Sequence, residues 1–71
     1  MISIEIQTDT IELQKFLKLA GLAESGGQAK QIILSGEVTV NGVSEKRRGL
    51  QLKAGDIVVC GAQTCQVIKR T

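Results

Sequence analysis

The spacing of apolar residues changes at Gly36, and this change constrains the fold more than any other feature of the sequence. Between Leu13 and Gly36, apolar residues recur every three or four positions, which is typical of the buried face of a helix. From Val38 onward they alternate with polar residues, as they do in half-buried strands. Helices followed by several short strands predict an α+β fold, in which two packed helices lie against a small antiparallel sheet.

The first helix is predicted to follow an opening strand. Residues 2–6 alternate between Ile and polar residues, as in a half-buried strand, and the segment Thr8–Thr10 interrupts the alternation. Asp9 is the expected N-cap, with Glu12 three residues later as its capping-box partner. The inward face of this helix is made of four residues at helical spacing: Leu13, Phe16, Leu17 and Ala20. Gly21 is expected to end the helix by taking a left-handed conformation.

A second helix is predicted to begin after Ser25, a preferred N-cap residue, with Gln28 in the capping-box position. Its inward face is formed by three apolar residues at helical spacing: Ala29, Ile32 and Ile33. Gly36 is expected to end this helix. The pair Asn41-Gly42 then predicts a tight hairpin, and a last hairpin is expected over residues 57–68.

The composition excludes several classes of function. Phe16 is the only aromatic residue, so the chain lacks the rings on which many single-strand binders stack bases. There is no His, the commonest general base and metal ligand, and we expect no catalysis, no metal site and no cofactor. Cys60 and Cys65 flank a predicted turn and could face each other as a redox pair. We favour the alternative that both are buried and pack as small hydrophobic residues.

Charge is unevenly distributed along the chain, whose net charge is +2. Residues 1–43 carry three Lys and five acidic residues, for a net charge of −2. Residues 44–53 carry four cations and one acid, for a net charge of +3, and the remaining residues carry +1. A mildly acidic body with one basic segment predicts a local docking patch for a polyanion.

Two glycines follow the cap of the predicted second helix. Glycine is a poor residue for a helix start, and Gly26 and Gly27 leave the first backbone amides open. Those amides and the positive end of the helix dipole suit a phosphate oxygen, and Lys30 lies one turn further on. The candidate phosphate site comprises Ser25, Gly26, Gly27, Gln28 and Lys30. Alternatively, the two glycines only permit a sharp bend between the helices.

The second candidate feature is a basic loop over residues 45–49. Its three consecutive cations are Lys46, Arg47 and Arg48, and each Arg can donate two parallel hydrogen bonds to a phosphate. The alternative is a loop that is only solvated. Lys15 and Lys18 on the outer side of the first helix are further candidates, and Lys69 and Arg70 lie near the end of the chain.

A spaced string of residues extends over about two thirds of the chain, from residue 13 to residue 56. Its members are Leu13, Phe16-Leu17, Ala20-Gly21-Leu22-Ala23, Ser25, Ala29-Lys30, Ile32-Ile33, Gly36, Val38, Val40-Asn41-Gly42, Arg48, Leu52 and Gly55-Asp56. This string resembles the alpha-L RNA-binding domain, first described in ribosomal small-subunit protein four. The segments 24–30 and 45–48 are similar to those of its small stand-alone bacterial members. The resemblance implies two helices packed on a small sheet, with structured RNA bound through its backbone and shape.

The chain departs from the family at two places. Many members begin the first helix with the pattern Arg-Leu-Asp, where this chain has Glu12 in place of Arg and Gln14 in place of Asp. Many also have Arg after the second-helix Ser, where this chain has Gly26. Two RNA-facing cations are therefore missing. The resemblance then shifts the expected RNA contact to the remaining cations Lys30, Lys46, Arg47 and Arg48, with the amides of the two glycines expected to replace a side-chain contact. In the fold that the resemblance implies, the first hairpin follows the second helix directly, so the basic loop is expected to lie beside the helix start at Ser25, on one surface.

The predicted function is non-catalytic binding of structured RNA, ribosomal or transfer RNA, by a monomer without a small-molecule substrate. We expect one domain over residues 1–71, with the family-like core at 13–56, an opening strand at 2–6 and a hairpin at 57–68. The alternative is a protein-interaction module that docks an acidic partner through the same basic loop. No signal-peptide pattern or membrane-length apolar run is present, so a cytoplasmic location is expected, with no membrane partner.

Overall fold

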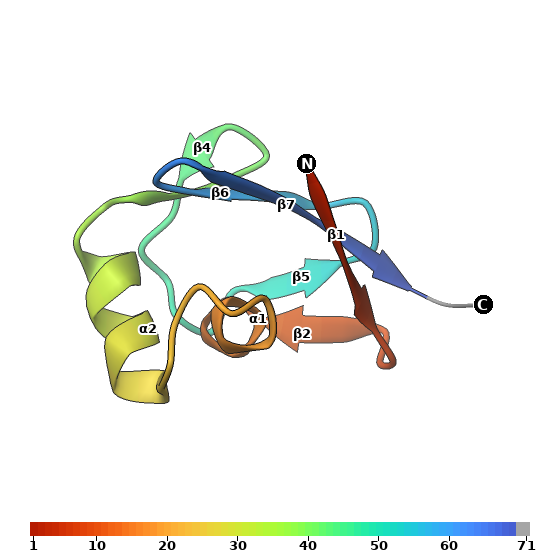
Figure 1. The fold of residues 1–71 in the computed structure, drawn as a ribbon, viewed down its shortest axis with the longest axis horizontal. Coiled ribbons are helices and arrows are strands. Elements are labelled where there is room, and N and C mark those ends of the chain that lie inside the picture. The colour runs from red at the N-terminus through yellow and green to blue at the C-terminus, as the bar shows by residue number, and fades with distance from the viewer. Residues whose placement is uncertain (70–71) are drawn as a thin grey trace.

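Two helices lie on one side of a five-stranded sheet, with a two-stranded ribbon beside them (Figure 1). The computed structural model describes residues 1–69, so the candidate Arg70 lies outside the described residues. The elements are β1 (Ile2–Ile6), β2 (Thr10–Glu12), α1 (Leu13–Leu19), α2 (Gly26–Leu34), β3 (Val38–Val40), β4 (Val43–Ser44), β5 (Gln51–Lys53), β6 (Ile57–Cys60) and β7 (Gln63–Lys69). The predicted α+β class with two packed helices is confirmed.

The main sheet has the strand order β1-β7-β6-β3-β4. Antiparallel pairs join β7, β6, β3 and β4, whereas β1 lies parallel to β7, with Ile4 opposite Val67. The sheet is therefore mixed, where an antiparallel sheet was expected. Hairpin patterns predict antiparallel pairing between strands that follow one another, but β1 and β7 come from opposite ends of the chain. Their parallel pairing is possible because the whole fold lies between them as the connection.

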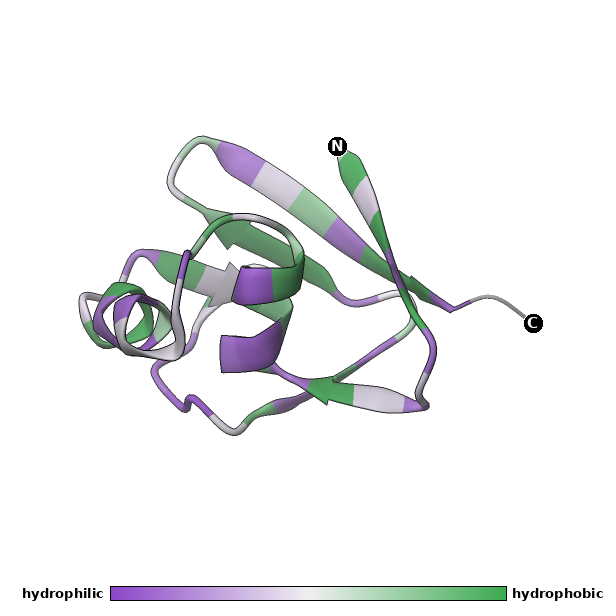
Figure 2. Ribbon diagram, turned by 60° about the horizontal axis from the view of Figure 1, so that its bottom comes forward, coloured by the Kyte–Doolittle hydropathy of each residue, from purple (hydrophilic) through white to green (hydrophobic). Residues whose placement is uncertain are grey.

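The core lies between the sheet and the two helices. Three residues of α1, Leu13, Phe16 and Leu17, are completely buried, as are Ala29 and Ile33 of α2. The strands contribute Ile6, Val38, Val40, Leu52, Val58, Cys65 and Val67. Apolar and polar residues alternate along the strands (Figure 2), so one face of the main sheet is turned toward the helices. The inward faces predicted for both helices are confirmed, with Ala20 and Ile32 partly buried at the edge of the core.

The start of α1 differs from the prediction. Residues 10–12 form the strand β2, which pairs with β5, and Glu12 stands at the N-cap without a side-chain hydrogen bond. The first amides of the helix instead donate to the loop before β5: Leu13 N to Leu50 O at 2.9 Å and Gln14 N to Arg48 O at 3.1 Å. These two carbonyls accept the hydrogen bonds that a side-chain N-cap would otherwise accept. The predicted Asp9 cap is wrong, because Asp9 pairs with Lys69.

The predicted helix end and hairpin turn are confirmed. Gly21 has a φ of +76°, and the amides of Gly21 and Leu22 donate to Lys18 O and Leu17 O, which closes α1 with a Schellman motif. At the first hairpin, Asn41 and Gly42 have φ values of 53° and 84°. Two consecutive positive φ values are typical of a type I′ turn, whose twist matches that of the flanking strands β3 and β4.

Cys60 and Cys65 do not lie opposite each other. Cys65 faces Val58 and Cys60 faces Gln63, so the two thiols are diagonal neighbours on one face of the β6–β7 pair. Both cysteines are free, with Cys65 fully buried and Cys60 half-buried. Burial raises the pKa of both thiols, which disfavours the reactive thiolate. Their environment is that of small hydrophobes.

Candidate nucleic-acid interface

The amino end of α2 is capped by Ser25 as predicted, but the Gln28 side chain reaches one residue further back than in a capping box. The Ser25 hydroxyl oxygen accepts from Gln28 N at 3.1 Å, and the Gln28 side-chain oxygen accepts from Glu24 N at 2.5 Å. Both side chains are therefore occupied in holding the helix start. Among residues 1–69, no acceptor is within hydrogen-bond reach of the amides of Gly26 and Gly27. These two amides are the ones left for an external anion.

The geometry does not require glycine at the start of α2. A Cβ at Gly26 would meet no atom within 4 Å, and one at Gly27 would meet only the Ser25 hydroxyl oxygen at 3.9 Å. Neither residue has a positive φ, and the left-handed residue between the helices is Gly21. The alternative of a glycine-dependent bend at Gly26 and Gly27 therefore has no support in the backbone. What the two glycines do provide is open space at their Cβ positions, beside the free amides.

The basic loop begins at the carboxyl end of α2. Glu45 N donates to Val38 O at 3.0 Å, and Lys46 Cε lies 3.6 Å from the position that a Cβ of Gly36 would take. The loop then passes to the start of α1, where the carbonyl of Arg48 accepts from Gln14 N. All three loop cations are exposed.

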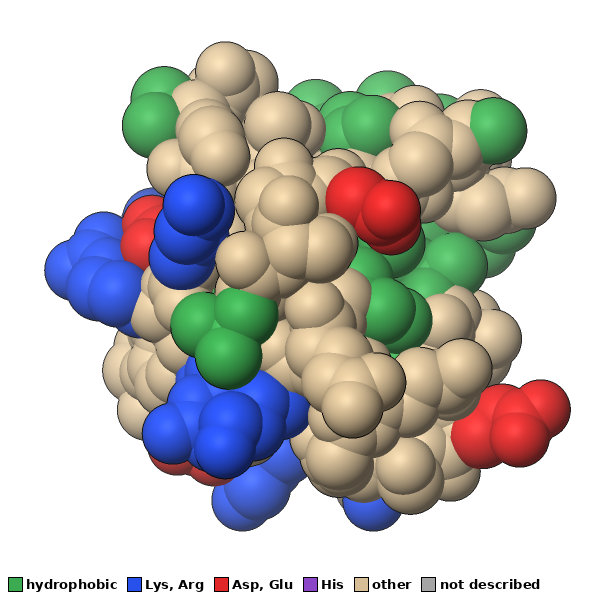
Figure 3. All heavy atoms as spheres, turned by 90° about the vertical axis from the view of Figure 1, so that its left-hand side faces the viewer, with side chains coloured by type: hydrophobic (Ala, Val, Ile, Leu, Met, Phe, Trp, Pro, Cys, Tyr) green, Lys and Arg blue, Asp and Glu red, His purple; other side chains and the backbone are tan. Residues whose placement is uncertain are grey.

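The amino end of α2 and the basic loop are not adjacent, contrary to expectation. The loop is fixed to β3, which follows α2 directly, and the nine residues of α2 separate its two ends by about 13 Å. Lys30 is exposed and lies between them along the helix. Figure 3 looks at the α2 side of the molecule and shows Lys and Arg side chains gathered along its left and lower parts. The cations form an extended track along this side, where a single cluster was expected.

Arg47 is held by a carboxylate of its own loop. Its Nε and Nη2 groups donate to the two oxygens of Glu45 at 2.9 and 3.0 Å, and its backbone amide donates to Glu45 Oε1 at 3.1 Å. These hydrogen bonds from Arg47 lower the pKa of Glu45 to about 2, so Glu45 is ionised at neutral pH. Two of the five guanidinium N–H groups are thus occupied, and three remain for other acceptors.

The remaining candidates have different surroundings. Lys15 lies 3.6 Å from Glu12 Oε1, and its side chain is mostly exposed. Lys18 is exposed in the last turn of α1, where a cation is favourable to the helix dipole. Lys69 is paired with Asp9 at the end of β7. Among residues 1–69, no three His, Cys, Asp or Glu side chains lie close enough to hold a metal ion, and no helix is long and apolar enough to cross a membrane.

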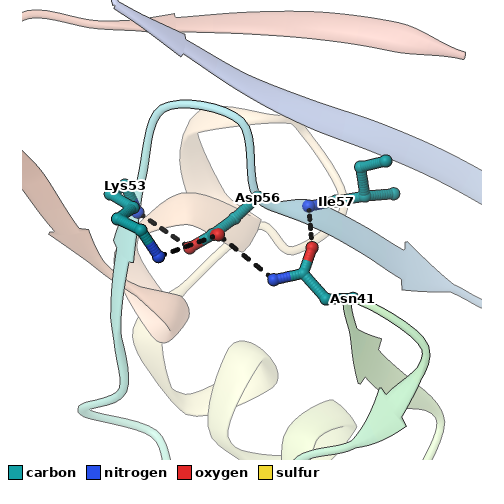
Figure 4. A network of polar contacts seen from close by, with 4 residues as sticks. All are labelled: Asn41, Lys53, Asp56 and Ile57. Atoms are coloured by element: carbon teal, nitrogen blue, oxygen red, sulfur yellow. Dashed lines mark hydrogen bonds and ion pairs between the residues drawn. The ribbon is translucent and has the colours of Figure 1, made fainter.

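One polar network was missed by sequence reasoning, and it connects two turns of the sheet region (Figure 4). Asp56 is only 7% exposed, and it accepts from Asn41 Nδ2 at 3.1 Å and from Lys53 N at 2.9 Å. Asn41 Oδ1 in turn accepts from Ile57 N at 2.9 Å. Burial raises the pKa of Asp56, but the hydrogen bonds from Lys53 and Asn41 and the Lys53 charge outweigh it, and the net pKa is lowered. The network joins the first hairpin turn to the turn between β5 and β6, so its role is structural.

Comparison with known proteins decides the family. A family model described as the S4 domain matches residues 4–68. The chain belongs to the S4 domain family. This S4 domain is similar to the "Probable ribosome maturation protein RlbA" of Bacillus subtilis (strain 168), with 47% identity over 55 residues, which cover 78% of each chain. It is also 41% identical over 58 residues to YbcJ of Escherichia coli (strain K12), covering 82% of this chain and 83% of that protein.

Solved structures agree with this assignment. The solution structure of Escherichia coli YbcJ, described as revealing an alpha-L motif involved in RNA binding, matches the S4 domain with a TM-score of 0.74. That match has 36% identity and covers 96% of this chain and 87% of YbcJ. The ribosomal protein S4e from Thermoplasma acidophilum shares the fold, with a TM-score of 0.62 at 16% identity, over 82% of this chain and 31% of that protein. The resemblance to the alpha-L domain predicted from the sequence is confirmed.

Proposed function

We propose that this S4 domain binds structured RNA without catalysing a reaction, through contacts of two surfaces with the phosphate backbone. The first surface is the amino end of α2, with the amides of Gly26 and Gly27 and the side chain of Lys30. The second is the basic loop, with Lys46, Arg47 and Arg48. Support comes from YbcJ, whose alpha-L motif is described as involved in RNA binding, and from RlbA, which is named for ribosome maturation. Ribosomal RNA is therefore the partner to test first.

The observation that carries the proposal is the pair of free amides at an open helix start, on the side of the molecule where the cations gather. The amides of Gly26 and Gly27 have no acceptor among residues 1–69, and a Cβ at Gly26 would meet no atom within 4 Å. Helix starts of this kind favour phosphate oxygens. Because α2 separates the two surfaces by about 13 Å, they would hold phosphates that are not neighbours along the strand. Such spacing favours a folded RNA over a flexible single strand, and phosphate contacts add little base specificity.

The test is a fluorescence-anisotropy titration of a labelled 20-base-pair RNA hairpin with the full chain. We expect the double variant Lys30→Ala/Arg48→Ala to bind at least about tenfold more weakly than the parent, because two phosphate contacts are lost. Lys69→Ala is the charge control, because Lys69 is paired with Asp9 away from these surfaces. This variant should bind the hairpin nearly as tightly as the parent does. The protein-docking alternative would be favoured by two results together. The chain would bind neither the hairpin nor purified ribosomal RNA, and it would bind an acidic protein through the basic loop with an affinity that does not depend on salt.

A further inference from the structure

A hollow of about 440 Å³ lies beside the first turn of α1, next to the basic loop. Its lining comprises Thr8, Thr10, Ile11, Glu12, Lys15 and Gln51. These residues supply two hydroxyl groups, one amide, one carboxylate and one ammonium group, whereas the Ile11 side chain lies on the opposite face of β2 and packs against the core. A polar lining of this kind suits a sugar, which presents hydroxyl groups, better than it suits a flat aromatic ring.

Glu12 is the unusual member of this lining. Its Oε1 lies 3.6 Å from Lys15 Nζ, and its Oε2 lies 3.7 Å from the position that a Cβ of Gly49 would take. The carboxylate therefore sits between the ammonium of Lys15 and the basic loop. A negative charge at this place repels a phosphate backbone, and a hydrogen bond accepted from the same molecule would offset that repulsion. The amides of Leu13 and Gln14 are already bonded to the loop, so recognition here falls to side chains.

We propose that this hollow binds one ribose of the RNA, with the Glu12 carboxylate accepting a hydrogen bond from the 2′-hydroxyl group and the Lys15 ammonium contacting the 3′-phosphate of the same nucleotide. The 2′-hydroxyl and the 3′-phosphate are carried by neighbouring carbon atoms of the sugar. An acceptor and a cation 3.6 Å apart match that pair of groups. A deoxyribose lacks the donor, so the contact distinguishes RNA from DNA. This inference rests on the proposed function and adds to it a site for a defined part of the ligand.

The experiment compares the affinities for two hairpins of identical sequence, one of RNA and one with 2′-fluoro substitution throughout. Fluorine keeps the sugar pucker of RNA but cannot donate a hydrogen bond. We expect the parent to bind the RNA hairpin about tenfold more tightly, the effect of one hydrogen bond to a charged acceptor. In Glu12→Ala the ratio of the two affinities should fall to about one, and in Glu12→Gln, which keeps a neutral acceptor, to about three.

The ratio is the informative quantity, because removing a carboxylate raises the affinity for both hairpins alike. Glu5→Gln makes the same change in net charge on β1 and should leave the ratio at its parent value. Glu12→Gln preserves the shape of the side chain in β2, which guards against a variant that fails to fold. Binding of both hairpins by the parent without discrimination, or an unchanged ratio in Glu12→Ala, overturns the inference while the proposed function stands. Failure of the parent to bind either hairpin overturns both.

Discussion

Glu45 and Arg47 form a closed pair within the basic loop, with both carboxylate oxygens and three N–H groups engaged at 2.9 to 3.1 Å. The Arg47 side chain is nonetheless 74% exposed, whereas that of Glu45 is 14% exposed. The carboxylate therefore lies beneath the guanidinium and neutralises it from the protein side. In a domain proposed to bind phosphates, this pair sets how much of the Arg47 charge is available to RNA.

Glu45→Gln is expected to strengthen binding to the RNA hairpin by about threefold at low salt, because it releases the solvent-facing guanidinium of Arg47 from its ion pair. It should also steepen the dependence of log affinity on log salt concentration, by at most about 0.9 on a duplex, because Arg47, which Glu45 partly neutralises in the parent, would then contribute its full charge. Anisotropy titrations at salt concentrations between about 50 and 200 mM measure both effects, because log affinity falls about linearly with log salt concentration over this range. Weaker binding by Glu45→Gln would show instead that Glu45 orients Arg47 for contact.

The salt dependence of the parent itself is a second test of the interface. With about four phosphate contacts, log affinity should fall with log salt concentration at a slope of about −3 to −4 on duplex-like RNA. Arg48→Ala should reduce this slope by about 0.9, whereas Lys69→Ala should leave it unchanged. A parent slope near zero would contradict binding through the phosphate backbone.

Gly26→Asp separates RNA binding from stability. The added carboxylate faces the positive end of the α2 dipole, so it should stabilise the fold by about 0.3–1 kcal/mol. The same charge repels a phosphate from the Gly26 and Gly27 amides, and we expect binding about tenfold weaker, from one lost charge-assisted hydrogen bond. Thermal unfolding and anisotropy measure the two effects.

Gly26→Ala is the uncharged control for this prediction, because its Cβ would meet no atom within 4 Å. Glu24→Gln, which changes a charge just before the helix start, should alter RNA binding less than Gly26→Asp does. Equal binding by Gly26→Asp and the parent would rule out the amide site.

Breaking the pair formed by Asn41 and Asp56 is expected to destabilise the fold without removing a residue proposed to contact RNA. Asn41→Ala removes the hydrogen bonds to Asp56 and Ile57 N, and it places Ala at a φ of 53°. We expect the free energy of unfolding to fall by about 2 kcal/mol, which lowers Tm by about 10 °C in a domain of this size. Asn41→Gly keeps the positive φ without strain. A parent-like Tm in Asn41→Gly would show that the side-chain hydrogen bonds contribute nothing.

Asp56 also predicts a dependence of stability on pH. Its pKa in the folded chain lies below the ordinary value of 3.8, because the hydrogen bonds and charge of Lys53 and Asn41 outweigh burial. The folded state therefore favours the ionised carboxylate. The resulting stabilisation is fully present above about pH 4 and is lost as the pH falls through the lowered pKa. Urea unfolding of the parent and Asp56→Asn should give a stability difference that shrinks below pH 4. A difference independent of pH between 2 and 6 would contradict this.

Much of the fold could be predicted from local sequence. The alternation in residues 2–6, the Ser25 cap, the Gly21 helix end and the Asn41-Gly42 hairpin all depend on residues within a few positions of one another. Local patterns report such relationships because the interacting groups are joined by a short piece of chain. The start of α1 could not be predicted this way, since its cap is a pair of carbonyls from the loop before β5.

The candidate site shows the same division. Charge and glycine content pointed to the amino end of α2 and to the basic loop, and the fold implied by the family resemblance placed the two side by side. The hydrogen bond between Glu45 N and Val38 O instead fixes the loop at the other end of α2. The partial neutralisation of Arg47 and the hollow around Glu12 and Lys15 also emerged only with the side chains in place.

Local sequence is enough to predict most of the helices and strands, most of the core residues and the segment in which positive charge is concentrated. These features depend on the period of apolar residues and on caps and turns that act over a few positions. The strand β2, the parallel pairing of β1 with β7, the hydrogen bond between Asn41 and Asp56 across 15 residues and the spacing of the cations follow from tertiary packing. Those relationships arise from packing segments that are distant in the chain, and no local pattern carries the information for them.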